Sequence, residues 1–352
     1  MTTTNDLVRE PAARQFVEVG GRKVAFEETG DPQGSPVFLL HGTPGSASGP
    51  KPRSIALHHL GVHLISYDRP GYGGSDRQEN RCVRDAAADV AAIADHLGLD
   101  RFAVVGRSGG GPHALACAAV LGERVTRMAA LVSVAPADAP DLDWYGGMNS
   151  GNAREYASAD SDERALLDTL DSWVKPSDNA ALDLLKSLLP QLCRFDRRVI
   201  EDVAMRRLLL ETYAEGLRRG ANGWIDDVRA FRKPWDVDLA EVNCPALFWH
   251  GEDDQFSPVE HSRWLAAHVR RARLVIQERS GHFGALEVLP DILSWLTADG
   301  DTHLALTPAT SWPEAAPAMD AGNVVELSSA GSLRRVRADQ SRGTPANRFV
   351  AP

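Results

Sequence analysis

The chain has 352 residues, of which 24% are charged and 43% hydrophobic, and a formal net charge of −10. This length suits one large α/β domain with an inserted subdomain or two average domains. The acidic balance disfavours nucleic acid as the main partner, because phosphate binding needs a basic surface. The first residues lack a signal-peptide pattern, and no apolar run approaches the ~20 residues of a membrane span. We therefore expect a cytoplasmic protein that binds neither nucleic acid nor a membrane.

The first elements predicted along the chain are a hairpin and a series of buried strands. Apolar and polar residues alternate on either side of Gly20-Gly21, which predicts an antiparallel hairpin at a sheet edge. Apolar strands recur further on, mostly separated by helical patterns such as residues 83–97. They cover residues 37–40, 63–67, 102–105, 128–134, 246–249 and 274–276. This alternation predicts an α/β fold with a mostly parallel central sheet and helices on both faces.

A serine lies at the turn that follows the strand at 102–105. The sequence Gly106-Arg107-Ser108-Gly109-Gly110 matches G-x-S-x-G and leads into a helix-forming stretch. In this motif the serine has φ above zero, and both outer glycines let the strand and the helix approach closely. The N–H of Gly109 lies at the positive end of the helix. The motif therefore predicts a nucleophile, Ser108, and half of an oxyanion hole.

A serine nucleophile needs a base, and the base needs a carboxylate that orients it. In hydrolases with this turn, the acid and then the histidine follow the serine, each after a strand. The strand at 246–249 opens into an acidic loop with Asp253 and Asp254, and the strand at 274–276 is followed by His282. The expected catalytic residues are thus Ser108, His282 and one of the two aspartates.

Together with two segments upstream of Ser108, these motifs make the chain resemble the α/β-hydrolase fold family. The resemblance covers about residues 14 to 298. Residues 36–45 (PVFLLHGTPG) resemble the family's oxyanion loop, and residues 66–75 (SYDRPGYGGS) its D-x-x-G-x-G-x-S turn. The resemblance implies Thr43 as the second oxyanion donor, and Pro44 has no N–H to give. The family's G-x-x-D spacing favours Asp254 over Asp253.

Between residues 134 and 246 only helical patterns occur, at 161–174, 179–192, 197–219 and 224–231. The resemblance implies that this stretch is a helical cap over the active site. The expected organisation is an N-terminal extension (1–13), a core (14–134 and 239–298), a cap (135–238) and a tail (299–352). Large side chains in the cap could line a pocket or hold helices together: Trp144, Tyr145, Met148, Tyr156, Trp173 and Trp224.

Other histidines and glycines allow competing interpretations. Residues 109–114 also match G-x-G-x-x-A, a dinucleotide fingerprint, but the next strand ends without an acid to bind a ribose. His41, His113 and His250 are interpreted as residues that anchor loops or pack. The remaining histidine pairs lack acidic or cysteine partners at ligand spacing, so we expect neither a metal nor a cofactor.

The tail, residues 299–352, differs from the rest in composition. It contains no lysine after residue 300, few aromatic residues and several arginines after residue 333. We expect a largely disordered segment with at most a short hairpin around residues 324–336. It is either dispensable or a docking segment for a protein partner.

The expected function is acyl transfer from a small ester, thioester or amide to water. Ser108 attacks, His282 acts as the base, Asp254 orients it, and Gly109 and Thr43 stabilise the oxyanion. The alternatives are a cofactor-free haloperoxidase or perhydrolase, a proline-iminopeptidase-like enzyme, and a non-catalytic ligand-binding receptor on the same fold. The serine of the G-x-S-x-G turn disfavours dehalogenase and epoxide hydrolase activity, because those enzymes have an aspartate at this position.

Overall fold

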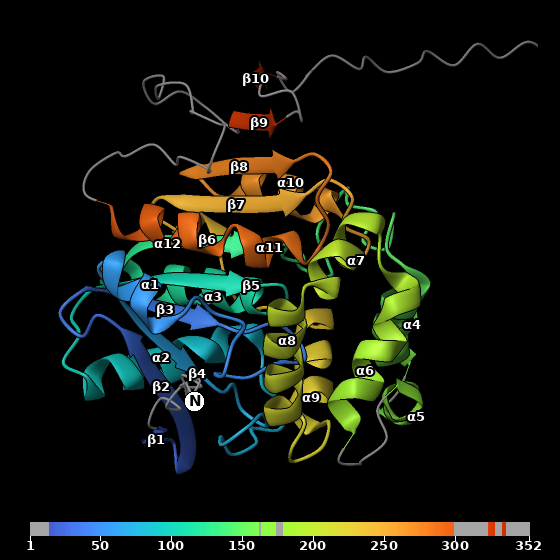
Figure 1. The fold of residues 1–352 in the computed structure, drawn as a ribbon, viewed down its shortest axis with the longest axis horizontal. Helices are drawn as coiled ribbons and strands as arrows, with labels where there is room; N and C mark the ends of the chain where they lie inside the picture. Colours follow the sequence, from blue (N-terminus) through green and yellow to red (C-terminus); the bar gives the residue numbers. More distant parts are fainter. Residues whose placement is uncertain (1–13, 162, 174–178, 299–322, 328–332, 336–352) are drawn as a thin grey trace, which may run out of the picture.

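The computed structural model describes residues 14–161, 163–173, 179–298, 323–327 and 333–335 (Figure 1). Their strands form one ten-stranded sheet in the order β1-β2-β4-β3-β5-β6-β7-β8-β9-β10. The strands are β1 (Gln15–Val19), β2 (Arg22–Gly30), β3 (Ser35–Leu40), β4 (Val62–Tyr67), β5 (Phe102–Arg107), β6 (Val125–Leu131), β7 (Ala246–Gly251), β8 (Ala272–Gln277), β9 (Asn323–Leu327) and β10 (Leu333–Arg335).

The sheet is mostly parallel, as predicted. β1 and β2 form the antiparallel hairpin expected at the edge, and β2 pairs antiparallel with β4. From β4 through β3 to β9, all neighbouring strands run parallel, and β10 returns antiparallel to β9. These pairings confirm the predicted α/β class.

Both faces of the sheet are covered by helices. Phe38 and Leu40 of β3 belong to one hydrophobic cluster, whereas Val37 and Leu39 belong to another. Successive residues of a strand point to opposite faces, so two covered faces require continuous apolar strands. The first face is covered by α2 (Ala86–His96), α3 (Gly110–Leu121) and α10 (Val259–His268), and the second by α1 (Ser54–His59), α11 (Gly284–Glu287) and α12 (Leu289–Thr297). Short 3-10 turns lie at η1 (Val83–Asp85), η2 (Gly122–Arg124), η3 (Leu189–Gln191) and η4 (Leu239–Glu241).

Between β6 and β7 the chain forms a helical insertion, defined here as α4 to α9. Its helices are α4 (Ser150–Ser161), α5 (Glu163–Trp173), α6 (Ala180–Leu188), α7 (Arg194–Glu201), α8 (Val203–Gly216) and α9 (Asn222–Arg232). Figure 1 shows the insertion at the end of the sheet toward which β5, β7 and β8 point. Ligands of open α/β sheets bind outside the carboxyl ends of the strands. The insertion therefore covers the edge where a site is expected.

The helical insertion differs from the sequence prediction in two places. Helix α5 corresponds to the pattern at 161–174, but α4, which precedes it, is not predicted. Because α4 buries only Gly151, Glu155 and Tyr156, it has no apolar stripe for a pattern to reveal. The pattern at 197–219 also predicts one helix, but the chain breaks at Asp202. That residue is extended, and its side chain accepts the N–H of Met205 as an N-cap.

One strand also ends earlier than predicted. β6 covers Val125–Leu131 instead of residues 128–134, because Val132 has a φ of 48° and leaves the strand conformation. The carbonyl of Val132 accepts a hydrogen bond from the Ser257 hydroxyl at 2.7 Å. The bend at Val132 therefore connects the end of β6 to the loop after β7.

Parts of the expected organisation lie outside the described residues, namely residues 1–13 and most of 299–352. In the C-terminal segment, β9 and β10 form the short hairpin predicted around residues 324–336. β9 also continues the sheet by pairing in parallel with β8. The expected domain boundaries stay a prediction.

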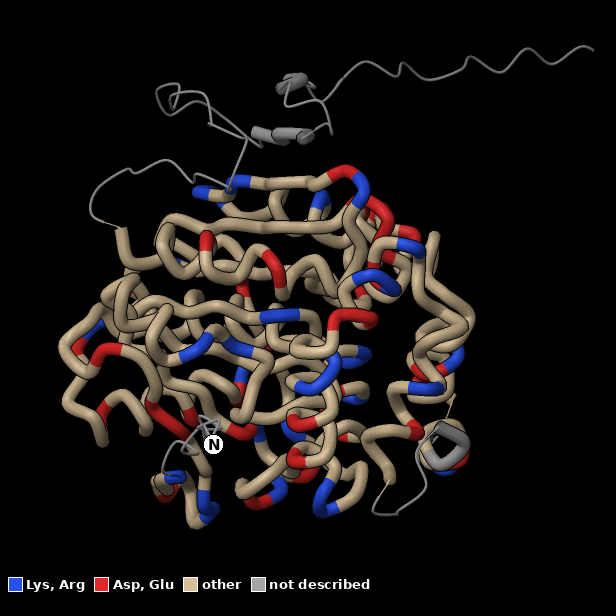
Figure 2. Tube along the Cα trace, viewed as in Figure 1, with Lys and Arg blue, Asp and Glu red and all other residues tan. Residues whose placement is uncertain are grey.

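Charged residues of both signs are interspersed along the described chain (Figure 2). None of the described helices combines the length and the apolar character needed to cross a bilayer.

Candidate active site

Ser108 occupies a sharp turn between β5 and α3. It has a φ of 53°, and its N–H donates to the carbonyl of Leu131 at 2.8 Å. A Cβ on Gly106 would collide with the backbone of Gly110, and a Cβ on Gly110 would collide with the carbonyl of Leu40. The strained turn and the two close approaches expected of a G-x-S-x-G motif are present.

The hydroxyl of Ser108 lies against an imidazole that in turn contacts a carboxylate. The Oγ of Ser108 is 3.0 Å from Nε2 of His282, and Nδ1 of His282 is 2.8 Å from Oδ2 of Asp254. The three residues follow β5, β8 and β7, so their side chains meet at the carboxyl edge of the sheet. These distances suit a nucleophile, a base and a carboxylate that orients the base.

Asp254 rather than Asp253 faces the imidazole. Asp254 is 4% exposed, and its Oδ1 accepts two backbone N–H groups of its own loop at 2.7 and 3.1 Å. Burial alone would raise the pKa of Asp254, but His282 and His250 hold it well below its usual range. Asp253 is exposed. The geometry therefore agrees with the spacing that favoured Asp254.

Thr43 and Gly109, the expected oxyanion donors, lie beside each other. A Cβ on Gly109 would collide with the side chain of Thr43. Thr43 and Ser108 also line the same cavity. Thr43 and Gly109 are therefore neighbours, and Thr43 faces the same cavity as Ser108.

A buried acid of the helical insertion, Asp227 on α9, fixes the loop that carries Thr43. Its Oδ2 accepts hydrogen bonds from the hydroxyls of Thr43 at 2.5 Å and Tyr72 at 2.8 Å. Arg69 and Arg81 donate to the same carboxylate at 2.5 and 2.7 Å. Burial alone would raise the pKa of Asp227, but the two guanidinium groups hold it well below its usual range. Because Arg69 also donates to two carbonyls of the loop after β3, the network joins α9 to that loop.

A second acid of the insertion, Asp196 on α7, holds the loop that carries His282. Its carboxyl oxygens accept the N–H groups of His282 at 3.1 Å and Phe283 at 2.7 Å. Burial raises the pKa of Asp196. A Cβ on Gly281 would collide with this carboxyl group, so the loop needs glycine there. Helices α7 and α9 thus each position one of the expected catalytic loops.

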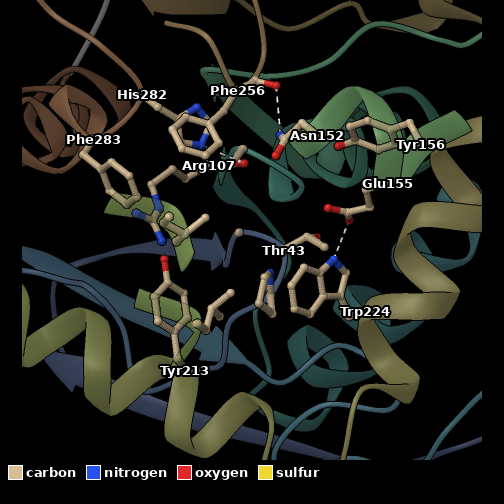
Figure 3. A pocket seen from close by; sticks show the side chains of 15 residues that line it. Thr43, Arg107, Asn152, Glu155, Tyr156, Tyr213, Trp224, Phe256, His282 and Phe283 are labelled. Atoms are coloured by element: carbon tan, nitrogen blue, oxygen red, sulfur yellow. Dashed lines mark hydrogen bonds between the residues drawn. The ribbon is translucent and has the colours of Figure 1, made fainter. Parts of the chain in front are cut away.

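A cavity that is partly open to solvent lies between Ser108 and the helical insertion. It is lined by Gly42, Thr43, Pro44, Arg107, Ser108, Asn152, Glu155, Tyr156, Leu184, Leu188, Tyr213, Trp224, Phe256, His282 and Phe283. Figure 3 shows Arg107 and Tyr213 on one side of it and Glu155 and Trp224 on the other. The polar and apolar side chains that converge on the cavity are typical of a site for a small organic molecule.

Of the large side chains that the sequence left between pocket lining and packing, Tyr156 and Trp224 line the cavity. Trp144 instead packs edge-on against Tyr156 and His261, which is a packing role. The side chain of Trp173 lies outside the described residues.

Glu155 places a carboxyl group inside the cavity. Its Oε1 accepts a hydrogen bond from Nε1 of Trp224 at 2.6 Å. Burial, with a smaller contribution from the negative charge of Asp227, raises the pKa of Glu155 to about 8. At neutral pH this carboxyl group is therefore mostly protonated, and it can donate one hydrogen bond as well as accept.

His41, His113 and His250 act as anchors between loops. Nε2 of His41 accepts the N–H of Arg69 at 3.2 Å. Nε2 of His113 lies 3.3 Å from Asp227, and burial lowers the pKa of His113 to about 4. His250 lies between a serine hydroxyl and a backbone carbonyl of the acid loop. In the described part of the chain, no cluster of three or more His, Cys, Asp or Glu residues is arranged to hold a metal ion.

Sequence reasoning did not identify Arg107, Glu155, Asp196 or Asp227. A signal for Asp227 exists, because it lies on the face of α9 that also carries Trp224 and Phe231 at helical spacing. An acid on an apolar face needs buried partners. The other three carry no such local signal.

Comparison with protein-family models matches residues 35–287 to the family described as alpha/beta hydrolase fold. Among curated proteins, a 2-hydroxy-6-oxo-6-phenylhexa-2,4-dienoate hydrolase from Comamonas testosteroni is 28% identical over 295 residues. That match covers 80% of this chain and 90% of the relative. A non-heme haloperoxidase from Rhodococcus erythropolis is 25% identical, covering 78% of this chain and 96% of the relative.

Solved structures show the same fold. A bromoperoxidase from Bacillus anthracis superimposes with a TM-score of 0.60 at 20% identity. The match covers 81% of this chain and 99% of the bromoperoxidase.

Proposed function

Because the chain belongs to the α/β hydrolase fold family, we propose that it is a serine hydrolase that transfers the acyl group of an ester-like substrate to water. The observation that carries the proposal is the contact series from Ser108 through His282 to Asp254, at 3.0 and 2.8 Å. In this arrangement a serine hydroxyl becomes nucleophilic only when its neighbouring imidazole accepts the proton.

In the proposed mechanism, Nε2 of His282 accepts the proton of Ser108 as Oγ attacks the substrate carbonyl. Asp254 holds the imidazole in the correct tautomer and stabilises its protonated form. The N–H groups of Thr43 and Gly109 donate to the oxyanion that develops on the carbonyl oxygen.

The imidazolium of His282 then returns its proton to the leaving group. Water repeats the sequence on the acyl-enzyme, with His282 again as the base, and frees Ser108. The step needs no cofactor, because every proton moves between Ser108, His282, water and the leaving group.

In this proposal the helical insertion acts as the cap that selects the substrate. Tyr156, Leu184 and Leu188 give the cavity apolar walls, whereas Asn152 and Glu155 add polar groups. Such a mixture suits a small organic acyl compound.

A second candidate is hydrolysis of a carbon–carbon bond next to a ketone, favoured by the relative from Comamonas testosteroni that is named a dienoate hydrolase. The same serine would attack a ketone carbonyl instead of an ester. A further candidate function, perhydrolysis, is favoured by the relative from Rhodococcus erythropolis that is named a haloperoxidase.

Two further alternatives are tested by the same assays. Proline iminopeptidases carry His-Gly-Gly-Pro-Gly where this chain has His-Gly-Thr-Pro-Gly, which disfavours peptidase activity. A receptor on this fold would bind a small molecule without turning it over.

We expect purified protein to hydrolyse short p-nitrophenyl esters and to react with a fluorophosphonate probe, because both require an activated hydroxyl. Ser108→Ala should abolish labelling and lower kcat on the order of 10⁴-fold or more. Ser294→Ala, which alters an exposed serine on α12, should keep the labelling. Labelling that persists in Ser108→Ala would refute the nucleophile, and an unreactive wild type that binds a small molecule would favour the receptor.

A further inference from the structure

Arg107, the residue before Ser108, is a buried cation. It is 8% exposed, and among the described residues its guanidinium forms no hydrogen bond and no ion pair. Other buried arginines differ in this respect. Arg69 and Arg81 both pair with Asp227, and Arg127 donates to the carbonyl of Trp295 at 3.1 Å.

Burying a charge without a counter-charge is costly, so such groups concentrate where a ligand completes them. Arg107 lines the cavity, and Nη2 lies beside Gly42, at the start of the expected oxyanion loop. Tyr213 of α8 lines the same side of the cavity. Figure 3 shows the hydroxyl of Tyr213 pointing toward the end of the Arg107 side chain.

The one acid in the cavity lining does not neutralise Arg107. Glu155 lies across the cavity, and its carboxyl group binds the indole of Trp224. Among the described residues that line the cavity, Arg107 alone carries a permanent positive charge. The cavity therefore offers one cationic end beside the nucleophile.

We propose that Arg107, together with the hydroxyl of Tyr213, binds a carboxylate of the substrate. The substrate class is then a carbonyl compound that carries a second, free carboxylate a few bonds from the carbonyl that Ser108 attacks. This assignment rests on the proposed function and narrows it to acyl compounds with an anionic end, such as half-esters of dicarboxylic acids.

The chemistry of the pair favours a carboxylate. A guanidinium fork matches both oxygens of a carboxylate, and the phenol hydroxyl supplies a further donor. One fixed positive charge balances one negative charge, whereas a phosphate dianion would leave an excess charge buried. Arg107 and Ser108 line the same cavity, so one small molecule can reach both of them.

The test compares monoethyl succinate, glutarate and adipate with their ethyl methyl diesters, which lack the negative charge. We expect the wild type to prefer at least one monoester, by kcat/KM, over its diester. In Arg107→Gln the ratio of monoester to diester kcat/KM should fall roughly 100-fold, and Arg107→Lys should restore part of it. Tyr213→Phe should lower the same ratio by a smaller factor. Arg164→Gln, at an arginine of α5 whose side chain is 83% exposed, is the matched control.

Equal or better hydrolysis of the diester at every chain length, in the wild type, would overturn the proposal without reference to any variant. So would a ratio in Arg107→Gln that equals the wild-type ratio.

The hydrolase mechanism and the carboxylate subsite can be tested independently of each other. If the wild type neither hydrolyses esters nor reacts with the fluorophosphonate, the hydrolase mechanism is wrong, but the subsite remains testable by calorimetry. Glutarate should then bind the wild type and lose at least tenfold in affinity in Arg107→Gln, at an unchanged melting temperature. Equal affinity in the two proteins would overturn the subsite.

Discussion

The loop after β7 carries two adjacent aspartates, of which Asp254 contacts His282 and Asp253 faces solvent. A carboxylate in contact with the imidazole, as that of Asp254 is, fixes the imidazole tautomer. In a serine hydrolase the loss of this carboxylate lowers kcat on the order of 10⁴-fold. We expect Asp254→Asn to show a loss of that order and Asp253→Asn to stay within about twofold of the wild type. Steady-state kinetics on a p-nitrophenyl ester measures both. The reverse ranking would move the acid by one position.

A single residue also gives the protein a pH-dependent stability. Burial raises the pKa of Glu155 from its ordinary value of 4.5 to about 8. Between those values the folded state keeps a proton that the unfolded state releases. The stabilisation is therefore complete below about pH 4.5 and is lost as the pH rises through about 8.

Glu155→Gln should remove this dependence, because an amide oxygen still accepts the hydrogen bond of Trp224 but does not ionise. The melting temperature of the wild type minus that of Glu155→Gln should fall by several degrees between pH 5 and pH 9. Glu79→Gln, at an exposed position, controls for surface charge. A difference that stays constant with pH would show that Glu155 has no raised pKa.

Among the elements, α7 contributes to the site through Asp196, which accepts the N–H groups of His282 and Phe283. An asparagine there has only one oxygen to accept with, so one of the two hydrogen bonds is lost. We expect Asp196→Asn to lower kcat about tenfold with little change in KM, because small displacements of a catalytic group are costly. Asp168→Asn on α5, whose side chain is 63% exposed, is the control. A change confined to the melting temperature would reduce Asp196 to a structural role.

The sequence predicts elements well where the signal is local. The elbow at Ser108, the acid loop and the loop of His282 each lie within a few residues of a strand, so spacing alone identifies them. Asp196 and Asp227 contact loops that lie 86 and 184 residues away along the chain. The spacing of apolar residues along the sequence does not indicate such long-range contacts. The same reason hides α4, whose buried side is too small to form an apolar stripe.

Arg107 shows a different limit. The motif places it at a variable position of G-x-S-x-G, where the turn accepts many residues. Its burial and its missing partner become visible only when Tyr213 and Glu155 of the insertion are placed around it.

For the whole molecule, the C-terminal segment extends the sheet by β9 and β10. Deleting residues 301–352 removes β9 and β10 and leaves β8 as an edge strand, whereas the proposed catalytic residues all precede residue 283. We expect the deletion to keep ester hydrolysis and to lower the melting temperature by less than about 5 °C. Because an unpaired edge strand can pair with another chain, the truncated protein should self-associate more.

Sedimentation velocity over a range of concentrations measures that association. A second truncation, of residues 336–352, keeps both strands and should behave like the full chain. A large loss of stability on the longer deletion, or an unchanged association, would contradict the assignment of this segment as an edge cover.

Two helices of the insertion hold loops of the proposed site, since Asp196 of α7 binds the backbone of His282 and Asp227 of α9 binds the side chain of Thr43. The cavity is partly open to solvent, so a small ligand can enter while these contacts are kept. A larger displacement of α7 or α9 would break them and release both loops. Local unfolding of the insertion would therefore stop the proposed chemistry while the central sheet stays folded.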